Sequence, residues 1–240
     1  MVESEIQRQM NPNKIARLAG FLYVMLIPLG VFGILYIPNN LIIPGDMAAT
    51  AVLIKEHEMT FRLSVLSALA VQLVNLVLVV LLYKLLKPIN KNYAALMVIC
   101  ILVAAPIAML NELNFLAMLL LINGNEYLMA FTGDQVNAVM LFLFDLHELG
   151  IQVASIFWGL WLLPMGYLIF KSGYLPKFIG VLLIIAATGY LIDSVNSFLF
   201  PNVGIQFSEF LFLGEILIAF WLMIKGVDRV QWKNRVELLQ

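Results

Sequence analysis

Charged residues are scarce in this sequence. Asp, Glu, Lys and Arg make up only 12% of its 240 residues, whereas 62% are hydrophobic. A soluble globular domain normally carries about 25% charged residues, so this composition excludes an ordinary soluble domain and indicates an integral membrane protein. The 14 basic and 15 acidic residues nearly balance, which gives no reason to expect nucleic acid or an acidic macromolecule as a partner.

Cysteine and histidine are nearly absent as well. The single cysteine, Cys100, has no partner for an intrachain disulfide and is expected to be a small packing residue. The two histidines, His57 and His147, do not form an HExxH pair. The sequence also lacks a phosphate loop, a dinucleotide fingerprint, a GxSxG elbow and a cysteine-based metal motif. No cofactor is therefore expected, and a divalent metal would need ligands from separate helices.

Long apolar runs fill most of the chain. Because about 20 apolar residues cross a bilayer, we predict an all-α membrane bundle of six transmembrane helices. Asp46 is placed to cap a short interfacial helix in the first outer loop, which should end near Met59. The predicted spans are 15–37, 61–83, 94–122, 147–170, 178–200 and 207–224, with a polar tail over 1–14 and a basic tail over 225–240.

The positions of the basic residues predict the orientation. All of the 14 lysines and arginines except Lys55 and Arg62 lie near the two ends of the chain or in the connections after the second and fourth spans. By the positive-inside rule, both termini are expected in the cytoplasm. Pro28 and Gly30 interrupt the first span, which predicts a kinked and closely packed helix.

Ionisable residues within the spans are the main functional signal. At a rise of ~1.5 Å per residue, separate helices are expected to place charge in the outer half of the bilayer. Six acids against one arginine and one histidine cannot all be neutralised by pairing, so some carboxyls are expected to be hydrated, protonated or bound to a cation. An aqueous pocket open to the outside accounts for this excess. The charged band consists of Arg62, Glu112, Asp145, His147, Glu148, Asp193, Glu209 and Glu215.

Helical spacing refines this pocket. Asp145, Glu148, Gln152 and Ser155 would form one polar stripe, and His147 would point about 100° away from Glu148. Asn111 and Asn114 form a further stripe, and Asp193, Asn196 and Ser197 another. Arg62 is expected to pair with Glu112 or Asp193. The alternative interpretation is that the group from Asp145 to Glu148 is the hydrated outer end of a long helix.

Several short motifs of the chain are distinctive when taken together. They are IARLAGFLYV (15–24), IIPGDMAAT (42–50), FRL (61–63), DLHELG (145–150), WGLWLLPMGYLIFKSGYLPKFIG (158–180) and GYLIDS (189–194). Together they resemble a family of bacterial multi-pass membrane proteins known only as a domain of unknown function, number four-three-eight-six. The resemblance extends from about Asn13 into the last span, and it implies a compact helical bundle in the bacterial plasma (inner) membrane. It implies no reaction, ligand or site residue.

Three hypotheses follow from these patterns. The first is binding or transport of a small ligand or cation, coupled to protonation of Glu112 or Asp193. The second is an accessory or structural membrane protein whose polar groups hold helices together or receive a partner. The third is an intramembrane metal-dependent hydrolase with His147, Glu148 and Asp193 as ligands. The lipid bilayer is the expected partner, and the sequence predicts neither the substrate nor the oligomeric state.

Overall fold

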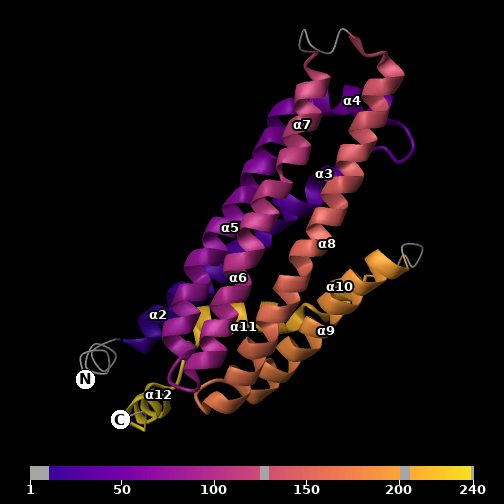
Figure 1. Cartoon of the computed structure of the whole chain (residues 1–240). Helices are drawn as coiled ribbons and strands as arrows, with labels where there is room; N and C mark the ends of the chain where they lie inside the picture. The colour runs from indigo at the N-terminus through magenta and orange to yellow at the C-terminus, as the bar shows by residue number, and fades with distance from the viewer. Residues whose placement is uncertain (1–10, 125–129, 201–205, 239–240) are drawn as a thin grey trace. The chain divides into compact units, whose positions relative to one another are not determined.

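The computed structural model describes residues 11–124, 130–200 and 206–238, and within these ranges it contains helices and no strand. Pro12–Asn40 forms one apolar stretch of three successive helical segments, of which η1 is a π-helix. Figure 1 shows the course of the chain. The segments are α2 (Pro12–Gly30), η1 (Val31–Leu35), α3 (Tyr36–Asn40), α4 (Met47–Glu56), α5 (Glu58–Leu86), α6 (Lys91–Asn111), α7 (Leu113–Ile122), α8 (Gly133–Ser172), α9 (Lys177–Leu199), α10 (Ser208–Leu211), α11 (Leu213–Ile224) and α12 (Arg229–Glu237).

Five helical stretches in the described residues are long and apolar enough to cross a membrane. They confirm the multi-pass character of the chain and contain the first five predicted spans. The sixth prediction, 207–224, is divided between α10 and α11. The 12 residues of α11 extend only ~18 Å, which is short of a hydrocarbon core of ~30 Å. The count of six spans and the cytoplasmic location of both termini therefore stay predictions.

The fourth predicted span begins earlier than expected. We placed its start at His147, but α8 begins at Gly133 and continues for 40 residues. The segment from Val136 to Phe144 is apolar except for Asn137 and contains neither Pro nor Gly, so nothing in it ends the helix. Asp145, His147 and Glu148 consequently lie within α8. Its length corresponds to ~60 Å, about twice the thickness of the hydrocarbon core.

The chain divides into two compact units. Unit 1 contains the chain up to Met25, Val74–Ala104 and the chain from Ser155 onward, whereas unit 2 contains Leu26–Leu73 and Ala105–Ala154. In unit 1, α9 packs against α10 and α11 (Figure 1). Small residues permit close approach here, because a Cβ at Gly214 would lie 2.8 Å from the backbone of Leu182 and Leu183.

The segment that we predicted as a basic C-terminal tail contains a helix in unit 1. It forms α12, which Asp228 caps by accepting hydrogen bonds from the N–H groups of Val230 and Gln231. Trp232 is fully buried, and its Nε1–H donates to the carbonyl of Leu85 over 3.0 Å. The Tyr174 hydroxyl donates to the same carbonyl over 2.8 Å. Burial of one aromatic side chain therefore fixes α12 against the end of α5.

Unit 2 has its own hydrophobic core. Asp46 caps α4 as predicted, with its Oδ1 accepting a hydrogen bond from the N–H of Ala49 over 2.8 Å. The helix ends at Glu56 rather than near Met59, because α5 already begins at Glu58. Side chains of α4, α5, α7 and α8 meet in the core, and these segments are shown in Figure 1. The buried core residues include Ile37, Met47, Ile54, Phe61, Val65, Phe115, Met118, Leu119 and Met140.

The irregularity predicted in the first span is a π-helix. Pro28 lacks a backbone N–H, and the π-helical turn η1 begins three residues later at Val31. Two serines of α5 donate hydrogen bonds to backbone carbonyls in this region. Ser67 Oγ donates to Leu29 O, near the end of α2, over 2.9 Å. Ser64 Oγ donates to Phe32 O of η1 over 2.6 Å. These contacts hold the altered segment on α5 and satisfy carbonyl groups that apolar surroundings would otherwise leave unpaired.

Candidate functional site

The candidate site in unit 2 is a buried histidine–carboxylate pair. His147 of α8 and Glu112, between α6 and α7, have side chains that are only 2% and 5% exposed. Their Nε2 and Oε1 atoms are 3.4 Å apart. An ionisable side chain in an apolar membrane segment is costly unless it is paired, so such groups often mark a site with a function. His147 and Glu112 are the two most buried titratable residues of the predicted pocket in this unit, and they lie in contact.

Asparagines position this pair. Asn111 Nδ2 donates to the backbone carbonyl of His147 over 2.8 Å. Asn114 Nδ2 in turn donates to the backbone carbonyl of Asn111 over 3.0 Å. A side chain that bonds a helix carbonyl competes with the regular backbone bond. The boundary between α6 and α7 falls on Glu112, whose φ of −62° and ψ of −17° stay in the right-handed helical region. The carboxylate therefore lies at the boundary of the two segments.

Gly150 explains how α8 can approach so closely. It lies three residues after His147 and so faces the same side of the helix. A Cβ at this position would collide with the side-chain amide of Asn111. The motif DLHELG thus contributes a buried imidazole and, one turn later, the space for the asparagine that bonds its backbone.

An aromatic ring covers the imidazole. The ring of Phe115 stacks on His147 with centroids 3.7 Å apart and an angle of 21° between the planes. Phe61 contacts Phe115 edge-on, with ring centroids 5.6 Å apart. We refer to Asn111, Glu112, Phe115 and His147 as the His147 cluster. Stacking fixes the orientation of the imidazole, and the apolar rings exclude water from one of its faces.

Two atoms of the His147 cluster are left without a hydrogen bond. Within the part of the chain that the structure describes, Glu112 Oε2 and His147 Nδ1 have no hydrogen-bond partner. Glu148 Oε1 lies 3.8 Å from Nδ1, beyond hydrogen-bond distance but close enough for an electrostatic contact, and its side chain is 47% exposed. A buried carboxylate oxygen without a partner is unusual. The pair can accept a proton or a cation at this oxygen.

A second polar contact lies in unit 1. Glu215 of α11 accepts hydrogen bonds from Tyr23 of α2 over 3.0 Å and from Tyr190 of α9 over 3.1 Å. Each carboxylate oxygen receives one hydroxyl. Three helices that are distant in the sequence are therefore joined through one carboxylate, as polar groups commonly join helices in membranes.

Asp193 has a structural role in unit 1. Its Oδ1 accepts from the N–H of Phe207 and its Oδ2 from the N–H of Ser208, each over 2.7 Å. These donors lie at the start of α10, whose first N–H groups have no partner inside the helix. Ser194, beside Asp193, donates through Oγ to the carbonyl of Tyr190. Both oxygens of Asp193 are thus used in holding α10 against α9.

The remaining residues of the predicted pocket lie apart from the His147 cluster. Arg62 forms a surface pair with Glu58, with Nη2 and Oε1 2.6 Å apart, so the predicted pairing with Glu112 or Asp193 was wrong. Asp145 is exposed on unit 2. Asp193 and Glu215 belong to unit 1. The side chain of Glu209 is not among those that the structure describes.

The predicted metal ligands do not form a recognisable metal centre. Among residues 11–124, 130–200 and 206–238, no group of three or more His, Cys, Asp or Glu side chains is arranged to hold a metal ion. Both carboxylate oxygens of Asp193 already accept short hydrogen bonds from backbone N–H groups. The metal-dependent hydrolase hypothesis therefore has no geometric support from these residues.

Sequence reasoning missed the partners that define both polar contacts. Tyr23 and Tyr190 were not identified, although an isolated tyrosine hydroxyl in an apolar span needs a hydrogen-bond acceptor. Phe115 and Gly150 were missed as well, although each lies three residues after a residue that we did identify, Glu112 or His147. This helical spacing was the available signal.

Comparison with known sequences identifies the family but no activity. An uncharacterised protein of Archaeoglobus fulgidus is 40% identical over 89 residues, which cover 35% of this chain and 54% of that protein. The chain thus spans about half the length of this relative. No solved structure matches. The sequence profile described as "Domain of unknown function (DUF4386)" matches residues 18–226, which include the motifs that carried the resemblance except for residues 15–17 of the first one. This multi-pass membrane protein therefore belongs to the DUF4386 family.

Proposed function

We propose that this protein binds a small cation at the His147 cluster and exchanges it for a proton, as a step in transport across the membrane. The observation that supports the proposal is the buried contact between His147 and Glu112, in which Glu112 Oε2 has no hydrogen-bond partner among the described residues. A carboxylate oxygen that the protein leaves unsatisfied is available to a proton or a cation.

Charge balance links the binding of a proton to the binding of a cation at this pair. With one proton shared between His147 and Glu112, the pair carries no net charge. Without that proton it carries one negative charge, and an uncompensated charge is costly in an apolar interior. A bound monovalent cation restores neutrality in the same way as the proton does. Proton and cation therefore compete for the same carboxylate, which is the requirement for exchange.

The amide side chains beside the pair also suit a binding site. Asn111 and Asn114 add amide oxygens next to Glu112, and oxygen atoms are the preferred ligands of small hard cations. Glu148, at 3.8 Å from His147 and half exposed, lies between the buried pair and the outside of unit 2.

The proposal is tested by observing His147 directly. The chain has two histidines, so the full-length protein with His57→Gln contains a single imidazole. In ¹⁵N-histidine-labelled protein in detergent, NaCl, KCl or CaCl₂ should shift the ring ¹⁵N resonances at constant pH in a saturable way. Choline chloride at the same ionic strength is the control salt. Acidification through about pH 8 to 5, where histidine usually titrates, should reverse the shift.

Variants separate this site from general salt effects. Glu112→Gln should abolish the cation response, whereas Glu58→Gln should retain it, because Glu58 is paired with Arg62 at the surface of the same unit. In liposomes, an imposed cation gradient should move protons with the wild type and with Glu58→Gln but not with Glu112→Gln. A folded wild-type protein whose imidazole responds to neither cations nor pH would contradict the proposal.

An accessory or structural role is the alternative that a specific observation favours. Asp193 and Glu215, two acids of the predicted pocket, have both carboxylate oxygens hydrogen-bonded within unit 1. If the His147 cluster serves the same purpose, Glu112→Gln should lower thermal stability without any change in cation or proton movement.

A further inference from the structure

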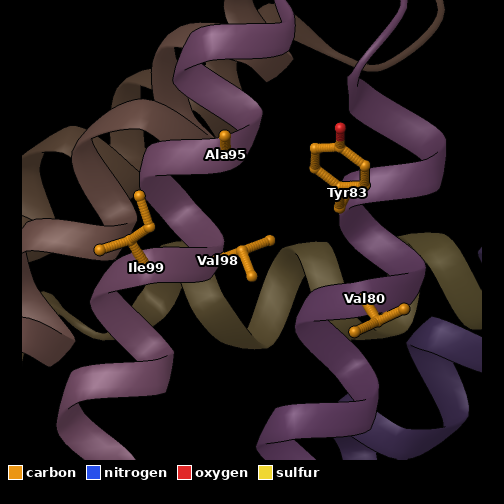
Figure 2. Close-up of a pocket in the computed structure, with 5 residues that line it drawn as sticks. All are labelled: Val80, Tyr83, Ala95, Val98 and Ile99. Atoms are coloured by element: carbon orange, nitrogen blue, oxygen red, sulfur yellow. The ribbon is translucent and has the colours of Figure 1, made fainter.

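A groove lies between α5 and α6 in unit 1. It has a volume of about 260 Å³ and is lined by Val80, Tyr83, Ala95, Val98 and Ile99. Figure 2 shows these side chains projecting from the two neighbouring helices, with the Tyr83 hydroxyl as the only polar side-chain group among them. The volume lies below the range of about 300 to 1,000 Å³ that is usual for pockets of drug-sized ligands. The groove is therefore suited to a narrow, apolar occupant.

The groove opens to the surroundings of the protein. Ile99 is 54% exposed and Val80 is 45% exposed. Both lie within stretches that are long and apolar enough to cross a membrane. At membrane depth the surrounding solvent is hydrocarbon, so the physical counterpart of an apolar groove is an acyl chain.

Basic residues continue the same helix faces beyond the groove. Val80 and Tyr83 of α5 and Lys87, the first residue after α5, follow the spacing i, i+3, i+7. The N–H of Lys87 still bonds to the carbonyl of Tyr83 over 2.9 Å, so Lys87 continues the groove-lining face. Its Nζ is 5.8 Å from the centroid of the Tyr83 ring. On α6, Lys91, Ala95 and Val98 follow i, i+4, i+7. Two lysines thus lie at the end of the groove where the chain turns from α5 to α6.

The start of α6 strengthens the positive potential at this end. The helix begins at Lys91, and Asn90 accepts hydrogen bonds from the N–H groups of Asn92 and Tyr93. A helix N-terminus carries a partial positive charge that favours anions. No Asp or Glu occurs between Glu58 and Glu112, so neither helix carries an acid near the lysines.

We propose that this groove binds one acyl chain of an anionic glycerophospholipid whose phosphate lies against Lys87 and Lys91. The apolar walls bind the chain, and the two lysines select a headgroup with net negative charge. Basic positions between transmembrane helices are a recurring way to recognise anionic headgroups. The occupant is thus distinguished from any lipid of the bilayer by its charge, and the groove is separate from the His147 cluster in its residues and in its ligand.

Native mass spectrometry of the full-length, delipidated protein in detergent tests both the role of the apolar groove and the role of the two lysines. The probes are dioleoyl phosphatidylglycerol and dioleoyl phosphatidylcholine, which share acyl chains and differ in headgroup charge. We expect the first phosphatidylglycerol molecule that binds to be held more tightly than the first phosphatidylcholine molecule. Removing one lysine charge should weaken its binding roughly fivefold, and removing both should weaken it roughly 25-fold, since a lysine near an anionic lipid contributes about a factor of five to ten. Lys87→Gln with Lys91→Gln is the test variant.

Two matched controls complete the design. Lys55→Gln removes one lysine from α4 in unit 2 and should leave phosphatidylglycerol binding unchanged, in contrast to the single variants Lys87→Gln and Lys91→Gln. Ala95→Leu fills the groove with a modest side chain and should lower the binding of the lipid even with both lysines present. Val181→Phe adds bulk at an exposed position of α9 in the same unit, away from the groove-lining residues, and should have no effect.

Three outcomes would overturn the proposal. Equal binding of the two lipids would remove the charge selection. Unchanged binding in the Lys87 and Lys91 variant, or in Ala95→Leu, would locate the lipid elsewhere. Dimers that carry no lipid in the wild type and dissociate in Ala95→Leu would assign the groove to a second copy of the chain.

Discussion

The side chain of Asn13 accepts a hydrogen bond of 2.8 Å from the backbone N–H of Val227, 214 positions later in the sequence. Gly226 permits this contact, since it has a φ of 72° and a Cβ at its position would collide with Asn13. The start of α2 and the connection between α11 and α12 therefore lie together. Trp232 of α12 also bonds to Leu85, so the end of α5 belongs to the same end of unit 1.

This arrangement predicts a labelling pattern. In a Cys100→Ser background, cysteines at Lys87 and Lys233 should react with an impermeant maleimide from the same side of the membrane, because both lie near the linked segments. A cysteine at Asn123, which follows α7, should react from the opposite side. The positive-inside rule assigns the first two to the cytoplasm. Labelling of Lys87 and Lys233 from different sides would contradict the arrangement.

The double acceptor at Leu85 predicts a non-additive loss of stability. Tyr174→Phe should cost about 0.5 to 1.5 kcal/mol, because Trp232 still bonds the carbonyl. Trp232→Phe should lose a similar hydrogen bond in addition to packing. Together they leave a carbonyl in the last turn of α5 without its side-chain donors, so the double variant should lose more than the sum. Thermal unfolding of the wild type, the two single variants and the double variant in detergent measures these losses of stability. Strictly additive losses would show that the Leu85 carbonyl is satisfied in another way.

Tyr174 also predicts alkaline sensitivity. Burial raises the pKa of its hydroxyl well above the ordinary value of about 10. In the unfolded chain the group ionises first, so its contribution to stability is complete below about pH 10 and decreases as the pH rises above that value. The wild type should lose more stability than Tyr174→Phe between neutral pH and about pH 11. Parallel slopes for the two proteins would exclude this contribution.

Two glycines near the π-helix predict opposite effects of alanine. A Cβ at Gly33 would collide with the backbone of Ala68, whereas a Cβ at Gly30 would have no neighbour within 4 Å. Gly33→Ala should destabilise the protein by about 1 to 3 kcal/mol through overpacking. Gly30→Ala should be neutral, or stabilising by up to about 1 kcal/mol because alanine favours a helix. Similar melting temperatures for the two variants would show that α5 does not approach η1 closely.

Asp193→Asn should reduce stability without changing metal content. An asparagine can accept only through its single carbonyl oxygen, so one of the two backbone donors at the start of α10 loses its partner, at a cost of about 1 to 3 kcal/mol. Elemental analysis of the detergent-purified wild type, Asp193→Asn and His147→Ala provides the second measurement. Stoichiometric zinc that disappears in both variants would restore the hydrolase hypothesis.

Helical organisation could be predicted from the sequence, but the pairing of polar residues could not. Apolar runs and breakers located the helices, since length and hydropathy are local properties. His147 and Glu112 were both identified because ionisable residues are conspicuous in apolar runs. Their contact depends on the register between α7 and α8, which packing of Phe115 and Gly150 determines. The hydrogen-bond partners of Asp193 could not be predicted, because Phe207 and Ser208 lie across a connection whose path no local pattern specifies.

The division into two units has a consequence for biosynthesis. Unit 2 is complete once Ala154 has been synthesised, whereas unit 1 needs segments from both ends of the chain. The carbonyl of Leu85 must wait for Trp232, 147 positions later, before both of its donors are present. A ribosome that has not yet synthesised α12 therefore still holds an unfinished unit 1. Truncation within the last ten residues, or a fusion partner attached directly to α12, should impair the final folding step more than a longer fusion at the N-terminus.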